Sequence, residues 1–280
     1  MKVSYYPGCA LHGTALEYDE STRAVSQMLG VQLCELPDWN CCGASSAHAT
    51  DESLATKLVV RNLEIAQEQG MDVVIPCAAC YSRFKAAEKE AIAGGGTRAR
   101  NQPFRILNLL EFIITSGLME KIQAMRKRPL AGLKVVCYYG CLLVRPPRVT
   151  GAKNYENPEE MDRLMKLLGA ESIPWSYKTD CCGGSLVLTR TDIVRSLTQK
   201  LFDKAVEAGA EAIVVACPLC QANLDSRQEE VSRETGKQYE LPILYFTELI
   251  GLAIDHRDAG KWFKRHFVSP KKLLTSKGLI

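Results

Sequence analysis

The stretch MDVVIPCAAC, residues 71–80, runs from a continuous apolar segment directly into a pair of cysteines. An apolar run of this length predicts a strand in a parallel sheet that is covered on both faces. Cys77 and Cys80 would then lie just beyond the carboxyl end of that strand, where sheets of this kind bind ligands. The segment AEAIVVACPLC at 210–220 repeats the pattern with Cys217 and Cys220. The chain therefore carries two copies of one strand-and-cysteine unit.

A second motif, two adjacent cysteines followed by glycine, also occurs twice. It is found in WNCCGAS at 39–45 and in KTDCCGGS at 178–185. In both copies, 34 residues separate the second adjacent cysteine from the C-x-x-C pair. Such a fixed spacing over a long interval indicates an internal duplication.

The duplication extends to an earlier cysteine in each half and to the residues after each C-x-x-C pair. Cys9 ends VSYYPGC and Cys141 ends VVCYYGC, while RILNLLEFI at 105–113 is similar to PILYFTELI at 242–250. The gap from this first cysteine to the adjacent pair is 31 residues in one half and 39 in the other. The second half thus carries an insertion of about eight residues.

Ten of the 12 cysteines form two sets of five. The sets are Cys9, Cys41, Cys42, Cys77 and Cys80, and Cys141, Cys181, Cys182, Cys217 and Cys220. Cys34, in a predicted strand, and Cys137, which aligns with Tyr5, are expected to be small buried apolar side chains outside the site.

Strand, helix, strand, helix and strand alternate in each half. We predict strands at 2–6, 71–76, 133–139 and 210–216, and helices at 17–29, 46–69, 157–170 and 186–208. In the helix at 157–170, Asn157 is the expected N-cap and Gly169 the expected stop.

This order predicts an α/β fold of two tandem homologous subdomains with mostly parallel sheets. We expect them to be related by a pseudo-two-fold axis, with the cysteine sites at the carboxyl ends of the strands. The predicted boundaries are 1–130, 131–256 and a basic C-terminal tail at 257–280.

The charge distribution bears on the partners. Net charge is +3, but residues 257–280 hold seven basic residues and one acidic residue, which leaves the body at about −3. This argues against a nucleic-acid-binding body. The first residues lack the apolar region of a secretory signal, and no apolar run is long enough for a membrane span. We expect a cytoplasmic protein.

Nucleotide-binding motifs are missing from the sequence. There is no G-x-G-x-x-G fingerprint, and AGGGTRAR at 93–100 lacks the Lys and Ser or Thr of a phosphate loop. We interpret that segment as a surface loop and expect no flavin or nicotinamide bound by this chain.

Five thiols per set point to the chemistry of the site. A tetrahedral zinc ion and an iron–sulfur cube each take four ligands, so five suggest an unusual cluster or one spare residue. The side chains of two neighbouring residues point in different directions. The two cysteines of an adjacent pair can therefore ligate different irons only where the backbone bends, and Gly43 and Gly183 permit such a bend. The adjacent pairs favour a multinuclear iron site, with structural zinc in one or both sets as the alternative.

The spacing of these cysteines resembles that of the CCG cysteine-rich domain family. Two copies in a chain of this size are similar to the B subunits of heterodisulfide reductases. The resemblance implies that each five-cysteine set holds a noncubane [4Fe-4S] cluster, and that a disulfide substrate binds between the two clusters and is reduced to two thiols. Electrons would come from a ferredoxin-like C-type subunit and a flavin-containing A-type subunit.

Alternatives and secondary residues stay open at this stage. Related tandem domains occur in hydroxy-acid and quinone-linked oxidoreductases, so an electron-relay subunit of such a complex is the alternative function.

His12 and His48 are close enough in sequence to their cysteines to donate hydrogen bonds at a cluster rim. The tail residues Trp262, Phe263 and Phe267 are hypothesised to dock onto a partner subunit, with a solvated tail as the alternative.

Overall fold

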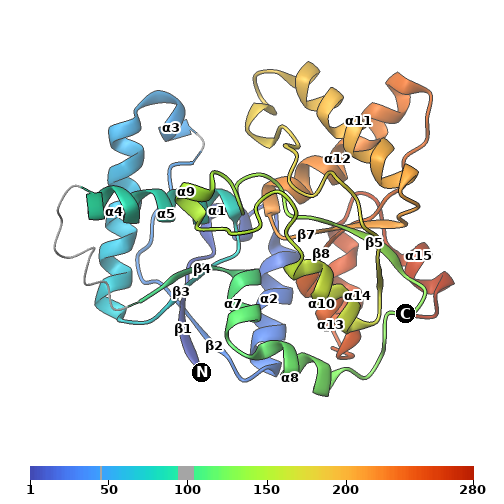
Figure 1. Ribbon diagram of the computed structural model, residues 1–280, viewed down its shortest axis with the longest axis horizontal. Helices are drawn as coiled ribbons and strands as arrows, with labels where there is room; N and C mark the ends of the chain where they lie inside the picture. Colours follow the sequence, from blue (N-terminus) through green and yellow to red (C-terminus); the bar gives the residue numbers. More distant parts are fainter. Residues whose placement is uncertain (45, 94–103) are drawn as a thin grey trace.

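The computed structural model describes residues 1–44, 46–93 and 104–280 of the chain (Figure 1). The surface loop predicted at 93–100 falls almost entirely outside these residues. Within the described part, no helix is both long enough and apolar enough to cross a membrane.

Each half contains a four-stranded sheet in which every pairing is parallel. The orders are β2-β1-β3-β4 and β6-β5-β7-β8, so the two sheets have the same topology. The strands are β1 Lys2–Tyr5, β2 Gln32–Glu35, β3 Val73–Ile75, β4 Ile106–Asn108, β5 Lys134–Tyr138, β6 Glu171–Ser172, β7 Ala212–Val215 and β8 Ile243–Tyr245. The predicted α/β fold with tandem parallel sheets is confirmed.

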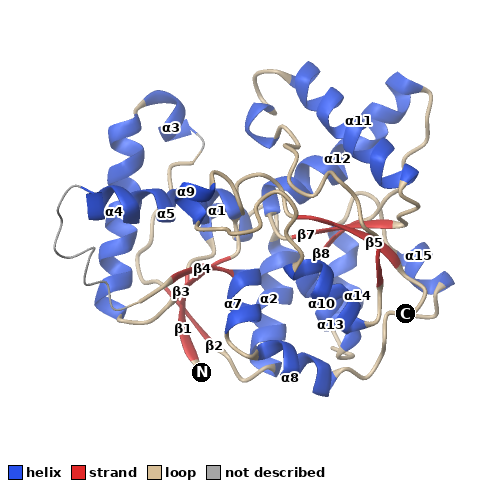
Figure 2. Cartoon of the chain, viewed as in Figure 1, coloured by secondary structure: helices blue, strands red, loops and turns tan. Residues whose placement is uncertain are grey.

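Helices connect and cover these strands (Figure 2). In the first half they are α1 Gly8–Leu11, α2 Leu16–Met28, α3 Ser46–Thr50, α4 Glu52–Gln69, α5 Ala78–Ala93, α7 Leu109–Thr115 and α8 Leu118–Met125. In the second half they are α9 Pro147–Thr150, α10 Glu160–Leu168, α11 Thr191–Glu207, α12 Pro218–Thr235, α13 Phe246–Ala253, α14 Ala259–Trp262 and α15 Lys271–Ser276, with 3-10 turns η1 Gly184–Leu186 and η2 Phe263–Arg265.

Three predicted helices begin later than expected or are divided. The predicted helix at 46–69 is divided into α3 and α4, because the Asp51 carboxylate accepts a hydrogen bond from the Leu54 amide at 3.0 Å and caps a new helix. α11 begins at Thr191 and not at residue 186. α10 begins at Glu160 with Glu159 as its N-cap, so the prediction of Asn157 as N-cap was wrong.

The two halves pack through equivalent helices. α2 packs against α13 of the other half, and α10 packs against α7 of the first half. α2 and α10 each follow the first strand of their half, and α7 and α13 each follow the last. The halves therefore exchange matching contacts, as a pseudo-two-fold relation requires.

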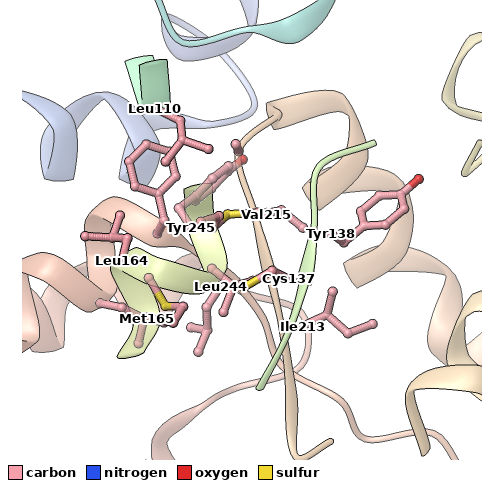
Figure 3. Packing of buried hydrophobic residues seen from close by; sticks show 14 of the residues in the cluster. Leu110, Cys137, Tyr138, Leu164, Met165, Ile213, Val215, Leu244 and Tyr245 are labelled. Atoms are coloured by element: carbon pink, nitrogen blue, oxygen red, sulfur yellow. The ribbon is translucent and has the colours of Figure 1, made fainter. Parts of the chain in front are cut away.

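One hydrophobic core runs through this interface. Figure 3 shows Leu110 of α7 beside Leu164 of α10 and Tyr245 at the end of β8, all in the same buried cluster. Buried hydrogen bonds also cross between the halves: the Tyr18 hydroxyl donates to the carbonyl of Ala216 at 3.2 Å. Burial of apolar area on this scale joins the halves into one packed unit.

The C-terminal segment, residues 257–280, folds back onto the protein. Trp262 is 2% exposed and Phe263 is fully buried, whereas Phe267 is 79% exposed. Arg265 pairs with Glu20 of α2 at 2.8 Å. The hypothesis that Trp262 and Phe263 dock onto a partner was wrong, because their apolar rings are used in this chain's own core.

Candidate functional site

All ten cysteines of the two sets follow the carboxyl ends of parallel strands. In the first half, Cys9 follows β1, Cys41 and Cys42 follow β2, and the C-x-x-C pair follows β3 into α5. In the second half, the same positions follow β5, β6 and β7. The topology of each sheet thus brings its five thiols to one edge, where ligands bind in such folds.

The exposure of the cysteines divides each set in the same way. The inner cysteines are buried, each 8% exposed or less: Cys42, Cys77, Cys80, Cys182, Cys217 and Cys220. The outer cysteines are solvent-accessible to different degrees: Cys9, Cys41 and Cys181 are exposed, and Cys141 is half-buried. Each set therefore has a buried base and an open face.

The inner sulfur atoms contact one another within each set. Cys42 Sγ lies 3.1 Å from Cys80 Sγ, and Cys182 Sγ lies 3.8 Å from Cys220 Sγ. The sets also approach each other, because the Cys77 and Cys217 side chains lie near one another across the two halves. Buried thiols of both sets therefore lie at the interface between the halves.

Hydrogen bonds from neighbouring thiols change the acidity of the inner cysteines. Bonds from Cys41 and Cys80 lower the pKa of Cys42 to about 3, despite its burial. A bond from Cys220 lowers the pKa of Cys182. Bonds from Cys220 and Cys77 lower the pKa of Cys217. Neighbouring thiols and burial instead raise the pKa of Cys77, Cys80 and Cys220. Because thiolates are the form that binds metal, Cys42, Cys182 and Cys217 are the inner thiols that most favour ligation.

Backbone amides add donors at the adjacent cysteines. The Gly43 amide donates to Cys41 Sγ at 3.4 Å, and the Gly183 amide donates to Cys181 Sγ at 3.3 Å. These glycines have φ of 72° and 80°, in the left-handed region that glycine adopts at little cost. The bend after each adjacent pair, expected from the sequence, is present in both halves.

Two further glycines leave space next to the C-x-x-C pairs. A Cβ atom at Gly8 would lie 3.1 Å from Cys80 Sγ, and one at Gly140 would lie 2.9 Å from Cys220 Sγ. Because contacts this short are seldom tolerated, each position needs glycine for the sulfur to keep its place.

We expect Gly140→Ala to disturb the second set more than its backbone strain alone explains. Gly140 and Gly236 both have φ of 70°, but a Cβ at Gly236 meets no atom within 4 Å. Both substitutions should cost about 1 to 2 kcal/mol through left-handed strain. Only Gly140→Ala should also reduce the iron bound per chain, measured after anaerobic reconstitution. Equal iron content in the two variants would contradict this role.

Sequence reasoning missed a matched pair of tyrosines below the sites. The Tyr6 hydroxyl donates to the carbonyl of Asn40 at 2.8 Å, and the Tyr138 hydroxyl donates to the carbonyl of Asp180 at 2.7 Å. Each accepting residue directly precedes an adjacent cysteine pair. The tyrosines therefore tie the first strand of each half to its adjacent cysteines, and their recurrence before Cys9 and Cys141 was the available signal.

The secondary candidates take different positions. His12 is exposed, with its Nε2 3.2 Å from Glu35 Oε1 and its ring edge-on to Trp39. His48 is exposed on α3. Cys137 is buried within β5 as expected, but Cys34, within β2, is only half-buried, because β2 is an edge strand, so its predicted burial was wrong. Neither residue is at the strand ends that carry the two sets.

The donor set fits an iron–sulfur group. Three buried thiols with lowered pKa, amide donors aimed at sulfur, and glycine-lined space beside the C-x-x-C pairs are features that bind such groups. Among the described residues, no three Cys, His, Asp or Glu side chains lie close enough together to hold a single metal ion. The inner thiols contact one another in pairs.

Two cysteine-bearing α/β repeats of this kind define a tandem cysteine-rich domain protein. The cysteine-rich domain family named CCG matches the chain twice, at residues 3–85 and 135–225. The chain belongs to the CCG cysteine-rich domain family, which confirms the expected resemblance.

Relatives of known name come from two kinds of complex. The chain is 29% identical over 263 residues to the 8-methylmenaquinol:fumarate reductase membrane anchor subunit of Wolinella succinogenes, covering 90% of this chain and 92% of that one. It is 28% identical over 268 residues to the B subunit of the ferredoxin:CoB-CoM heterodisulfide reductase of Methanosarcina mazei, covering 90% and 89%. Both are homologues over almost their whole length.

A solved structure shares the fold. The crystal structure of a hypothetical protein from Helicobacter pylori superposes with a TM-score of 0.70 at 10% sequence identity, covering 96% of this chain and 52% of that one. At this identity the likeness shows the fold alone.

Proposed function

We propose that the two cysteine sets hold two [4Fe-4S] clusters of the noncubane type, and that the chain is the catalytic iron–sulfur subunit of a disulfide reductase. The observation that carries the proposal is the presence of two equivalent five-cysteine sets, which follow the carboxyl ends of two parallel sheets of the same topology and approach each other at Cys77 and Cys217. Reducing a disulfide takes two electrons. Two linked one-electron sites match that requirement.

The clusters, when bound, would supply the one-electron steps of the reaction. The protein's part is to hold and orient them. The buried inner thiols provide the base of each site, with the amides of Gly43 and Gly183 favouring negative charge on sulfur. The outer residues Cys9, Cys41 and Cys181 are exposed, so each site is open to solvent on one side.

Partners follow from the same proposal. The chain carries no nucleotide-binding fingerprint, so its electrons would come from a ferredoxin-like C-type subunit and a flavin-containing A-type subunit. The homologous Methanosarcina mazei protein is named as a subunit of a ferredoxin-dependent complex. A complex of this kind would lie in the cytoplasm.

A second candidate is an electron relay within a quinone-linked oxidoreductase. It is favoured by the Wolinella succinogenes homologue, whose name describes a methylmenaquinol:fumarate reductase subunit. Two cysteine sets that approach each other across the interface would serve a relay as well as a catalyst. The two candidates differ in whether a disulfide reacts at the sites.

One anaerobic experiment separates these functions. The purified chain is assayed for iron, sulfide and zinc, and its electron paramagnetic resonance spectrum is recorded while disulfides of different end groups are added. Disulfide reduction requires full iron occupancy and a spectrum that changes with at least one disulfide. Full clusters whose spectrum no disulfide alters would support the relay, and stoichiometric zinc with little iron would exclude both.

A further inference from the structure

A cavity of about 370 Å³ lies where the two halves meet, between α7, α9 and α10. Its walls are mostly apolar, and two of the residues that line it closely follow site cysteines in the sequence. Tyr81 directly follows Cys80, and Leu143 lies two residues after Cys141. The cavity therefore adjoins one turn from each cysteine set, and its volume suits a small molecule.

A carboxylate without a cationic partner lies in this cavity. Glu111, in the first turn of α7, accepts hydrogen bonds at Oε2 from Asn108 at 3.3 Å and from Tyr81 at 3.4 Å. Within the described residues it forms no ion pair: the charges of Lys85 and Arg105 act on it only from a distance, and these side chains pair with Glu88 and Asp72. Burial raises the pKa of Glu111. Such a group is stabilised by a donor or a positive charge.

The equivalent carboxylate in the second half shows which kind of group binds at this position. Glu111 in RILNLLEFI corresponds to Glu248 in PILYFTELI, and the latter is fully buried. There, His266 of the C-terminal segment brings its Nε2 to 2.8 Å from the carboxylate. The ring of Trp262 packs on Gly251, whose counterpart is Ile114. The chain thus fills the counterpart space itself and places a nitrogen on the carboxylate.

We propose that the first-half cavity binds a ligand that places a protonated amine on Glu111. Resting on the proposed function, this ligand is one arm of the disulfide substrate, so the substrates are disulfides of amino thiols. The apolar walls would hold the carbon chain of the arm, and the sulfur end would lie toward the turns of Cys80 and Cys141. Arg163 and Lys153, at the rim, are exposed, so water and salt screen their charges.

Thioethers test this preference without exchanging with the protein's thiols. Bis(2-aminoethyl) sulfide, thiodiglycol and 3,3′-thiodipropionate differ mainly in the charge of their ends. On the anaerobically isolated chain, calorimetry should show the diamine binding most tightly and the diacid least. Glu111→Gln should weaken the binding of the diamine by about tenfold or more, because a buried charge pair is lost. The affinity for thiodiglycol should not change.

Two further variants locate the effect. Glu160→Gln removes another carboxylate that lines the same cavity, and it should change the affinity for the diamine less than twofold. Ala152→Trp should fill the cavity and abolish binding of all three compounds, which covers the case in which Glu111→Gln fails to fold. Equal affinities for diamine and diacid, or a diamine affinity that neither Glu111→Gln nor Ala152→Trp alters, would overturn the proposal.

The outcome is independent of catalysis. Thioethers accept no electrons, so the experiment tests binding alone. If they fail to bind as expected, the proposed disulfide reductase activity is not contradicted, but its substrate is a different disulfide. Conversely, a chain that reduces no disulfide can still show the preference for amines. The binding site and the proposed function therefore fail separately.

Discussion

Cys217→Ala is expected to remove the cluster of the second set while the first set keeps its own. Cys217 is buried at the N-cap position of α12, beside Cys220 and Cys77. Because changes outside the ligand shell already cost metal sites about 10- to 100-fold, loss of a ligand should reduce disulfide-dependent turnover by more than about 100-fold. Iron and sulfide analysis with single-turnover spectroscopy checks both results.

The matched control is Cys34→Ala. Cys34 is a cysteine of the same chain, but it lies within β2, away from the strand ends. Its substitution should leave iron content and turnover unchanged. If Cys217→Ala retained the iron of the unmodified chain, or if Cys34→Ala lost as much, the assignment of the two sets would have to be abandoned.

The sheet architecture and the grouping of the cysteines could be predicted because they are encoded locally. Apolar runs such as 71–76 identify strands by their period, and glycine identifies the turns that follow them. Equal spacing in the two halves then places Cys41 and Cys181 in equivalent positions. Short-range signals repeated twice were enough to gather each set at one edge of a sheet.

The interface between the halves could not be predicted in this way. Tyr18 bonds to Ala216 and Ser21 bonds to Thr247 across about two hundred residues of sequence. No periodicity encodes such pairings, because each depends on how two finished subdomains pack. The cavity around Glu111 arises at the same interface, so nothing in the local sequence distinguishes Glu111 from other helix residues.

The C-terminal segment is a second example. Seven basic residues made 257–280 look like a separate tail, which would either dock onto a partner or be solvated, since charge usually marks a surface. The charges are on the outside, but the segment also carries Trp262, Phe263 and Leu274, all of which are buried. A basic composition therefore concealed an amphipathic segment whose apolar side packs against the body.

The stability of the protein is expected to depend strongly on His266 of this segment. It forms a fully buried pair with Glu248, and His266→Ala would leave that carboxylate without its partner. Breaking a buried pair on one side costs roughly 3 to 5 kcal/mol in the free energy of unfolding. His48→Ala, at an exposed helix position, should change it by less than about 0.5 kcal/mol. Urea unfolding measures both.

The pH dependence of stability separates this charge effect from simple loss of packing. Burial alone would lower the pKa of His266, but the charges of Glu248, Asp225 and Glu17 outweigh it and raise the pKa to about 9. Because the unfolded value is about 6.5, the pair contributes fully below that pH, by about 3 kcal/mol, and its contribution is lost as pH rises through 9. The unmodified chain should therefore lose stability between pH 6.5 and 9, and His266→Ala should flatten that decline. An equally steep decline in the variant would show that His266 is not charged in the folded protein.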